Sequence, residues 1–150
     1  MAQSLTCLYA HLVFSTKHRE PWFTVEIRSC VHTYLAGIIR ELESPWVGVG
    51  GVADHVHLLF EMSKMTAPAT IVGTVKRESS KFIKTLGNQY AKFYWQRGCG
   101  MFSVSPKDIR QATRYVHNQE EHHRTLSFQE EYRAMLNRYG IKFNEAYVWD

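Results

Sequence analysis

The spacing of apolar residues in this chain switches between the two-residue alternation of strands and the three-to-four-residue repeat of helices. The order of these switches strongly limits the fold. In chain order, the predicted elements are a strand over Tyr9–Ser15, a helix over Val25–Glu43, strands over Trp46–Val52 and His55–Met62, a helix over residues 67–86, a strand over Gly100–Ser105, a helix from Ser105 to about Glu121 and a helix over Phe128–Tyr139. Pro45 lies just beyond the first helix, and the short Ala53–Asp54 link predicts an antiparallel hairpin.

The order strand–helix–strand–strand–helix–strand is that of the split βαβ, ferredoxin-like arrangement. We therefore predict an α+β fold with one four-stranded antiparallel sheet, helices on one face, and an added C-terminal helix and tail. Since 150 residues is a typical length for one domain, residues 1–150 are predicted to form a single domain.

Composition argues against a membrane protein or a disulfide-stabilised one. Hydrophobic residues make up 45% of the chain and charged residues 21%, as in ordinary globular proteins. No apolar run approaches the roughly 18 residues of a membrane helix, and the first residues lack a basic leader. The three cysteines are widely spaced and odd in number, which is typical of a reducing cytosol. We therefore expect a cytoplasmic protein with no membrane partner.

Positive charge is concentrated in one part of the chain. Residues 76–117 hold nine basic and two acidic side chains, a net charge of +7, although the whole chain carries only +4. Aromatic residues are interspersed there, and such a mixture suits a phosphate backbone with bases to stack on. A solvated helix face is an equally good interpretation of the charge alone. The candidate DNA-binding residues are Lys76, Arg77, Lys81, Lys84, Arg110 and Arg114.

The strand DHVHLLF predicts a pair of metal ligands. Its apolar residues Val56, Leu58 and Phe60 alternate with His55 and His57, so the apolar set should lie under the helices and both imidazoles should project from the open face. Two neutral imidazoles at this spacing can share a divalent metal. The alternative is that they are simply polar surface.

A second candidate pair lies on the predicted helix that begins at Ser105. Residues four apart share a helix face, so Tyr115 and Gln119 should point the same way. A tyrosine hydroxyl is a phosphate nucleophile once deprotonated, although its usual pKa of about 10 means that it needs help. The Gln119 amide oxygen is a plausible third metal ligand. The alternative is a surface pair on a basic helix, and His122 and His123 are interpreted as helix-end residues that interact with the helix dipole.

Taken together, the two pairs resemble a known family. His-x-His on a strand, followed by Tyr-x-x-x-Gln on the last major helix of a ferredoxin-like chain, is similar to the single-tyrosine HUH transposases (the IS200-like superfamily). These include the REP-associated tyrosine transposases. Further similar stretches are LVFSTKHREPWF, GVADHVHLLFEM, VKRESSKFIK and FSVSPKDIRQATRYVHNQEEHHRTLSFQEEY, so the resemblance covers nearly the whole chain.

The resemblance implies roles for these residues. His55, His57 and Gln119 would bind a divalent metal, Mg²⁺ or Mn²⁺, and Tyr115 would attack the scissile phosphate to form a 5′-phosphotyrosine intermediate. The substrate would be single-stranded DNA with hairpins near the ends of a mobile element. The family works as a homodimer whose active sites are shared in trans, so that each tyrosine helix faces the partner's histidines. No nucleotide cofactor is implied, and the place of action would be the bacterial nucleoid.

Two other functions are compatible with parts of the sequence. A non-catalytic or domesticated ferredoxin-like nucleic-acid-binding protein would need the basic region but no metal. A zinc protein could use some of the eight histidines, although zinc sites usually show closely paired ligands and the cysteines are unpaired. No GxxxxGK[ST] loop is present, which argues against a P-loop ATPase. The proton acceptor for Tyr115 is not identified by the sequence.

Overall fold

A four-stranded antiparallel sheet forms the centre of the protein, as seen in a computed structural model. The model describes residues 2–150, without the side chains of residues 46 and 47. The strands are β1 (Tyr9–Ser15), β2 (Trp46–Gly51), β3 (His55–Glu61) and β4 (Gly100–Val104), in the order β2-β3-β1-β4. Each adjacent pair is antiparallel. The predicted α+β, ferredoxin-like sheet is thereby confirmed.

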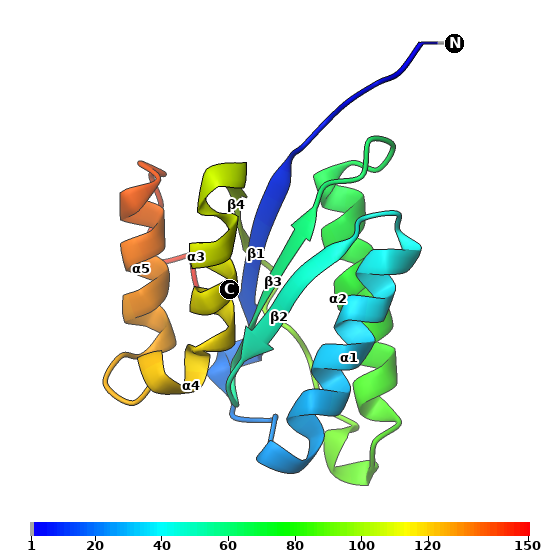
Figure 1. Cartoon of the computed structure of the whole chain (residues 1–150). Helices are drawn as coiled ribbons and strands as arrows, with labels where there is room; N and C mark the ends of the chain where they lie inside the picture. Colours follow the sequence, from blue (N-terminus) through cyan, green and yellow to red (C-terminus); the bar gives the residue numbers. More distant parts are fainter. Residues whose placement is uncertain (1) are drawn as a thin grey trace.

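Helices α1 (Val25–Glu41) and α2 (Pro68–Lys84) cover one face of the sheet (Figure 1). The apolar residues of β3 point toward them, as the alternation predicts, and Val56, Leu58 and Phe60 are fully buried in the core under these helices. The histidines of β3 must therefore face the other way. None of the helices in the described part of the chain is long and apolar enough to cross a membrane.

The second face of the sheet, expected to be open, is covered. Helices α3 (Ile109–His117), α4 (Gln119–His122) and α5 (Phe128–Arg138) lie there (Figure 1). They bury a smaller apolar cluster formed by Val13, Phe102, Phe128, Tyr132, Met135 and Leu136. The expectation that both imidazoles project from an open face is therefore wrong, because His55 and His57 have no exposed surface. Three short 3-10 turns, at Lys17–Arg19, Asn88–Tyr90 and Pro106–Asp108, complete the structure.

Helix α3 approaches the sheet closely at Gly50. A Cβ atom at this position would lie 1.9 Å from the carbonyl oxygen of Val116, which no real contact allows. Gly50 is also the cross-strand partner of His57. The glycine therefore lets the helix that carries Tyr115 lie directly over β2, beside the strand that carries the histidines.

The predicted continuous helix from Ser105 to about Glu121 is interrupted. It begins as a 3-10 turn, and Asn118 breaks it with φ −97° and ψ 25°. The Asn118 amide donates to the carbonyls of both Arg114 and Tyr115. Asn is a weak helix former and a common helix end, which accounts for the break. Gln119 thus starts the new helix α4 instead of continuing α3.

Candidate metal centre and nucleophile

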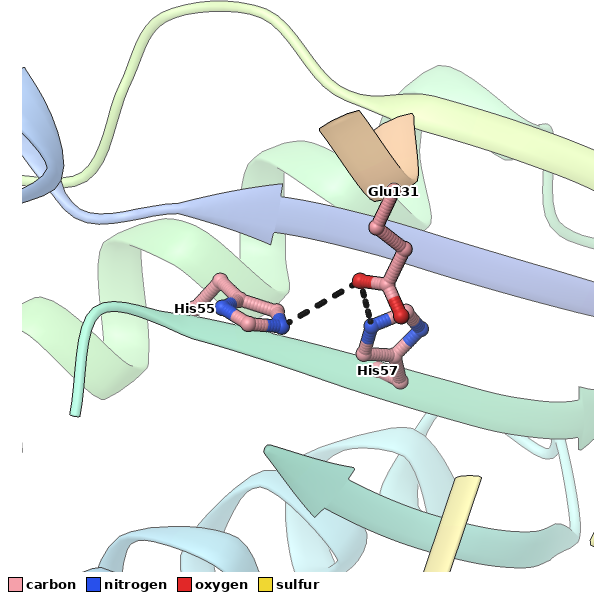
Figure 2. A group of neighbouring side chains, drawn as sticks. All are labelled: His55, His57 and Glu131. Atoms are coloured by element: carbon pink, nitrogen blue, oxygen red, sulfur yellow. Dashed lines mark hydrogen bonds and ion pairs between the residues drawn. The ribbon is translucent and has the colours of Figure 1, made fainter. Parts of the chain in front are cut away.

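His55 and His57 present the same ring nitrogen to one point. His55 Nδ1 lies 2.7 Å from Asp54 Oδ1, and His57 Nδ1 lies 2.8 Å from His11 Nε2. Both Nε2 atoms are left facing the space beneath α5 (Figure 2). Partners of this kind fix the tautomer and the orientation of metal-binding imidazoles. Asp54 and His11 therefore prepare the pair for a cation.

Glu131 on α5 completes the group and was not predicted from the sequence. Its Oε1 lies 3.0 Å from His57 Nε2 and 3.4 Å from His55 Nε2 (Figure 2). One ligand atom from each of the three buried residues lies within 4.8 Å of the others. Two imidazoles and a carboxylate form a donor set that suits a divalent cation, so the residues present fit a metal.

A capping box at the start of α5 places Glu131. The Ser127 hydroxyl accepts a hydrogen bond from the Glu130 amide at 3.2 Å, and Glu130 Oε2 accepts one from the Ser127 amide at 2.8 Å. This reciprocal pair fixes the first turn. Glu131 then points inward and Glu130 stays exposed.

Gln119 and His123 line the same space. Gln119 Oε1 lies 3.2 Å from His55 Nε2, while its amide nitrogen donates to the Tyr115 carbonyl that the helix break leaves without its usual partner. His123 Nε2 lies 3.1 Å from both Gln119 Oε1 and Glu131 Oε1. The interpretation of His123 as only a helix-end residue is therefore wrong, since its side chain belongs to the site.

Tyr115 is held by the same carboxylate. Its hydroxyl donates a hydrogen bond to Glu131 Oε2, and its ring packs against His122 with centroids 4.6 Å apart. Burial, together with the charge of Glu131 and this hydrogen bond, raises the pKa of Tyr115. In this arrangement Tyr115 is a neutral phenol, and positive charge is needed before its oxygen can become a strong nucleophile.

The ionisation of the buried group follows from its contacts. Burial favours the neutral form of His55, but hydrogen bonds with Asp54 and Glu131 outweigh it and raise the pKa of His55 to about 9. Burial dominates at His57 and lowers its pKa to about 4. Burial also acts on Glu131, but hydrogen bonds from His123, His55 and His57 hold the pKa of this carboxyl well below its usual range. Without a metal, the group holds an anionic Glu131 beside a protonated His55.

Lys76, one of the candidate DNA-binding residues, is bound by backbone carbonyls of its own chain. Its ammonium donates to the carbonyls of Gln96 at 2.9 Å, Arg97 at 3.0 Å and Gly98. These three contacts use all three hydrogens of the ammonium group. Lys76 therefore ties α2 to the loop before β4, and its charge is not free for phosphate in this structure.

The other basic candidates lie on two different layers. Arg77 and Lys81 are exposed on α2 and pair with Glu78, and Lys84 lies over the ring of Tyr94 at 4.3 Å. This helix covers the face opposite the histidines. Arg110 and Arg114 are exposed on α3, the helix that carries Tyr115.

Comparison with known proteins identifies what the chain is similar to. The family model described as "Transposase IS200 like" matches residues 4–119. No curated protein sequence matches the chain. One similar solved structure is a candidate transposase from Deinococcus radiodurans R1, with a TM-score of 0.62 and 20% identity over 79% of this chain and 98% of the other. Another is a REP-associated tyrosine transposase bound to a REP hairpin, with a TM-score of 0.56 and 11% identity over 77% of this chain and 70% of the other.

The family match and the site do not cover the same residues. The match contains His55, His57, Tyr115 and Gln119, but it ends before α5. Glu131 lies beyond the matched residues, although the family-like stretch that ends at Tyr132 includes it. The only sequence signal is a pair of acids at the start of a helix, and such acids commonly serve the helix dipole instead.

Proposed function

This chain belongs to the IS200-like transposase family, and on that premise we propose that residues 1–150 act as one HUH domain that cleaves and rejoins single-stranded DNA through Tyr115. One observation carries the proposal. A single buried carboxylate, Glu131, contacts the Tyr115 hydroxyl with one oxygen and both candidate metal-binding histidines with the other. A nucleophile and a cation site that share one side chain are suited to attack on a phosphodiester.

His55, His57 and Glu131 would hold the cation, with the Gln119 amide oxygen beside His55 as a further ligand. Mg²⁺ and Mn²⁺ are the proposed ions, because carboxylate and amide oxygens suit both. When bound, the cation would polarise the phosphate and offset the negative charge that develops during the exchange.

In the proposed first step, the Tyr115 hydroxyl gives up its proton, its oxygen forms a bond to the phosphorus, and the bond from phosphorus to the 3′ oxygen breaks. The products are a 5′-phosphotyrosine and a 3′ oxygen, which takes up one proton and becomes a free 3′ hydroxyl. A 3′ hydroxyl then attacks the phosphotyrosine and releases Tyr115 during rejoining. The phosphotyrosine bond conserves the energy of the broken phosphodiester, so no nucleotide cofactor is needed.

The proposed substrate is single-stranded DNA that carries hairpins, as at the ends of a mobile element. A structural relative bound to a REP hairpin supports this choice, and the exposed Arg110 and Arg114 on the helix that carries Tyr115 suit a phosphate backbone. We expect the protein to act at the bacterial nucleoid.

The family resemblance implies a homodimer with active sites shared in trans. The structure of one chain contains the alternative, cis arrangement, in which Tyr115 and Gln119 reach the histidine group of their own chain. A trans dimer would have to break the contact between Gln119 and His55 and form it again across subunits. Subunit mixing decides between the two arrangements.

The decisive experiment is incubation of the protein with labelled single-stranded hairpin DNA and Mg²⁺ or Mn²⁺, followed by denaturing electrophoresis. We expect a covalent protein–DNA band that Tyr115→Phe abolishes while DNA binding remains, because Phe lacks only the nucleophilic oxygen. EDTA should also abolish the band. DNA binding with no band under any metal condition would instead identify a non-catalytic nucleic-acid-binding protein.

A further inference from the structure

A cleft of about 460 Å³ opens beside Tyr115, and the chemistry proposed above does not use it. Helices α3 and α5, strand β4 and the turn Pro106–Asp108 all contribute to its walls. His11 connects the cleft to the metal centre, since it lines the cleft and its Nε2 lies 2.8 Å from His57 Nδ1. A molecule bound in the cleft would therefore lie beside the nucleophile.

Arg138 brings a positive charge to the cleft. It is exposed at the end of α5, and its charge acts to lower the pKa of Tyr115 against the larger effects of burial and Glu131. Among residues 2–150, Arg138 forms no ion pair, whereas Arg133 of the same helix pairs with Glu145 at 2.6 Å. An unpaired guanidinium beside a nucleophile is well suited to a phosphate group.

The other walls suit a nucleobase. One face of the Tyr139 ring stacks on Phe102 with centroids 4.7 Å apart, and its hydroxyl donates to the Ser103 carbonyl, yet the residue stays 43% exposed. A fixed aromatic ring with free surface is a stacking platform for a base. Asp108 and Gln111 line the cleft as exposed polar groups, and such side chains read the edges of bases.

We propose that this cleft binds one unpaired nucleotide of the DNA strand that Tyr115 cleaves. Arg138 contacts its phosphate, Tyr139 stacks on its base, and Asp108 and Gln111 contact the edge of the base. The identity of the strand rests on the proposed function, but nucleotide binding in the cleft does not. The Asp108 carboxylate accepts hydrogen bonds, so it favours bases that carry an amino group over thymine, which has none.

Nuclear magnetic resonance of the full chain with ¹³C-methyl-labelled methionine tests this proposal. Met135 lines the cleft, whereas Met62 packs against the core on the opposite face of the sheet and serves as an internal control. The probes are the four deoxynucleoside 5′-monophosphates and inorganic phosphate. The Met135 signal should shift saturably with the adenine, cytosine and guanine nucleotides, more weakly with the thymine nucleotide and least with phosphate, while the Met62 signal stays constant.

Two variants and a matched control sharpen the test. Arg138→Gln should weaken nucleotide binding at least about tenfold, because a charge-assisted contact is lost. Arg124→Gln, which changes an exposed arginine outside the cleft, should not weaken it. Asp108→Asn should reduce the discrimination against the thymine nucleotide, since an amide can donate as well as accept.

The assignment is overturned if the nucleotides leave Met135 unmoved, if phosphate binds as tightly as a nucleotide, or if both variants bind like the wild type. The readout requires neither a metal nor cleavage. Absence of the covalent band therefore contradicts the proposed function alone, while a static Met135 signal contradicts the nucleotide cleft alone.

Discussion

The Tyr115 hydroxyl donates its hydrogen bond to Glu131 Oε2, and the other oxygen of that carboxylate lies between His55 and His57. The candidate nucleophile and the candidate metal ligands are thus linked through one side chain that lies outside the family-matched segment. This link makes Glu131 the residue whose replacement should be most informative.

Glu131→Gln should weaken Mn²⁺ binding by at least about tenfold, because the change removes the only carboxylate of the three-residue group while keeping its shape. Isothermal titration calorimetry measures the affinity directly. Glu130→Gln is the matched control, since glutamine at this position can still form the capping box and Glu130 lies outside the site. Equal Mn²⁺ affinity in the two variants would remove Glu131 from the ligand set.

Metal affinity should depend on pH through His55. Its pKa of about 9 means that the metal-free protein keeps a proton on His55 at neutral pH, and a metal must displace that proton. Between pH 7 and pH 9 we expect Mn²⁺ affinity to rise about tenfold per pH unit and then to level off. Calorimetry in buffers of different ionisation enthalpy should show release of about one proton at pH 7.

The same shift predicts how the stability of the metal-free protein changes with pH. A pKa raised from 6.5 to about 9 on folding stabilises the native state fully below pH 6.5. This contribution is lost as the pH rises through 9, so thermal unfolding should shift to lower temperature over that range. His55→Gln should flatten the dependence. An unchanged slope in that variant would mean that another group is responsible.

Mixing Tyr115→Phe protein with His57→Ala protein tests where each site is built. If the site forms within one chain, every site in the mixture keeps one defect and no covalent band returns. If sites are shared in trans, some heterodimers carry one intact site and cleavage partly recovers. The contact between Gln119 Oε1 and His55 of the same chain predicts an inactive mixture. Proven subunit exchange is the necessary control, and recovered activity would contradict the cis arrangement.

Replacement of Lys76 should mainly affect stability, whereas replacement of Arg114 should mainly affect the salt dependence of DNA binding. Lys76→Gln should lower the free energy of unfolding by about 2 kcal/mol through loss of its charged hydrogen bonds, with little change in the salt dependence of DNA binding. Arg114→Gln should leave stability nearly unchanged and reduce the slope of log affinity against log salt by about 0.7 to 0.9. Denaturant titration and binding at several salt concentrations measure both. The reverse pattern would contradict the structural role of Lys76.

The sheet and the orientation of the histidine pair could be predicted because strand alternation is a local property of the sequence. Val56 and His57 are neighbours in the chain, so placing one of them in the core places the other on the opposite face. The packing of helices over the histidines could not be predicted in this way. It depends on how α5 packs, and a helix of eleven residues can bury its apolar face against several surfaces.

The site residues that the sequence did not reveal were missed for a different reason. Glu131 and His123 lie near helix ends, where acidic and basic residues are common for electrostatic reasons alone. Their role depends on contacts with the histidines of β3, which are distant in the sequence, and Glu131 also reaches Tyr115 of α3. The contacts of Lys76 could not be predicted for the same reason, since the carbonyls that bind it lie about twenty residues further along the chain.

Gly50 sets the distance between α3 and the sheet because it has no Cβ atom. The carbonyl of Val116, the residue after Tyr115, lies where a Cβ atom at position 50 would be placed. Gly50 itself pairs with His57. The main chain of the tyrosine helix therefore rests on the main chain of β2, the strand that pairs with the histidine strand. This spacing cannot be retuned by exchanging one side chain for a larger or smaller one. Exposed side chains of α3 can therefore vary without moving the helix, because the depth at which it sits is fixed by the polypeptide backbone itself.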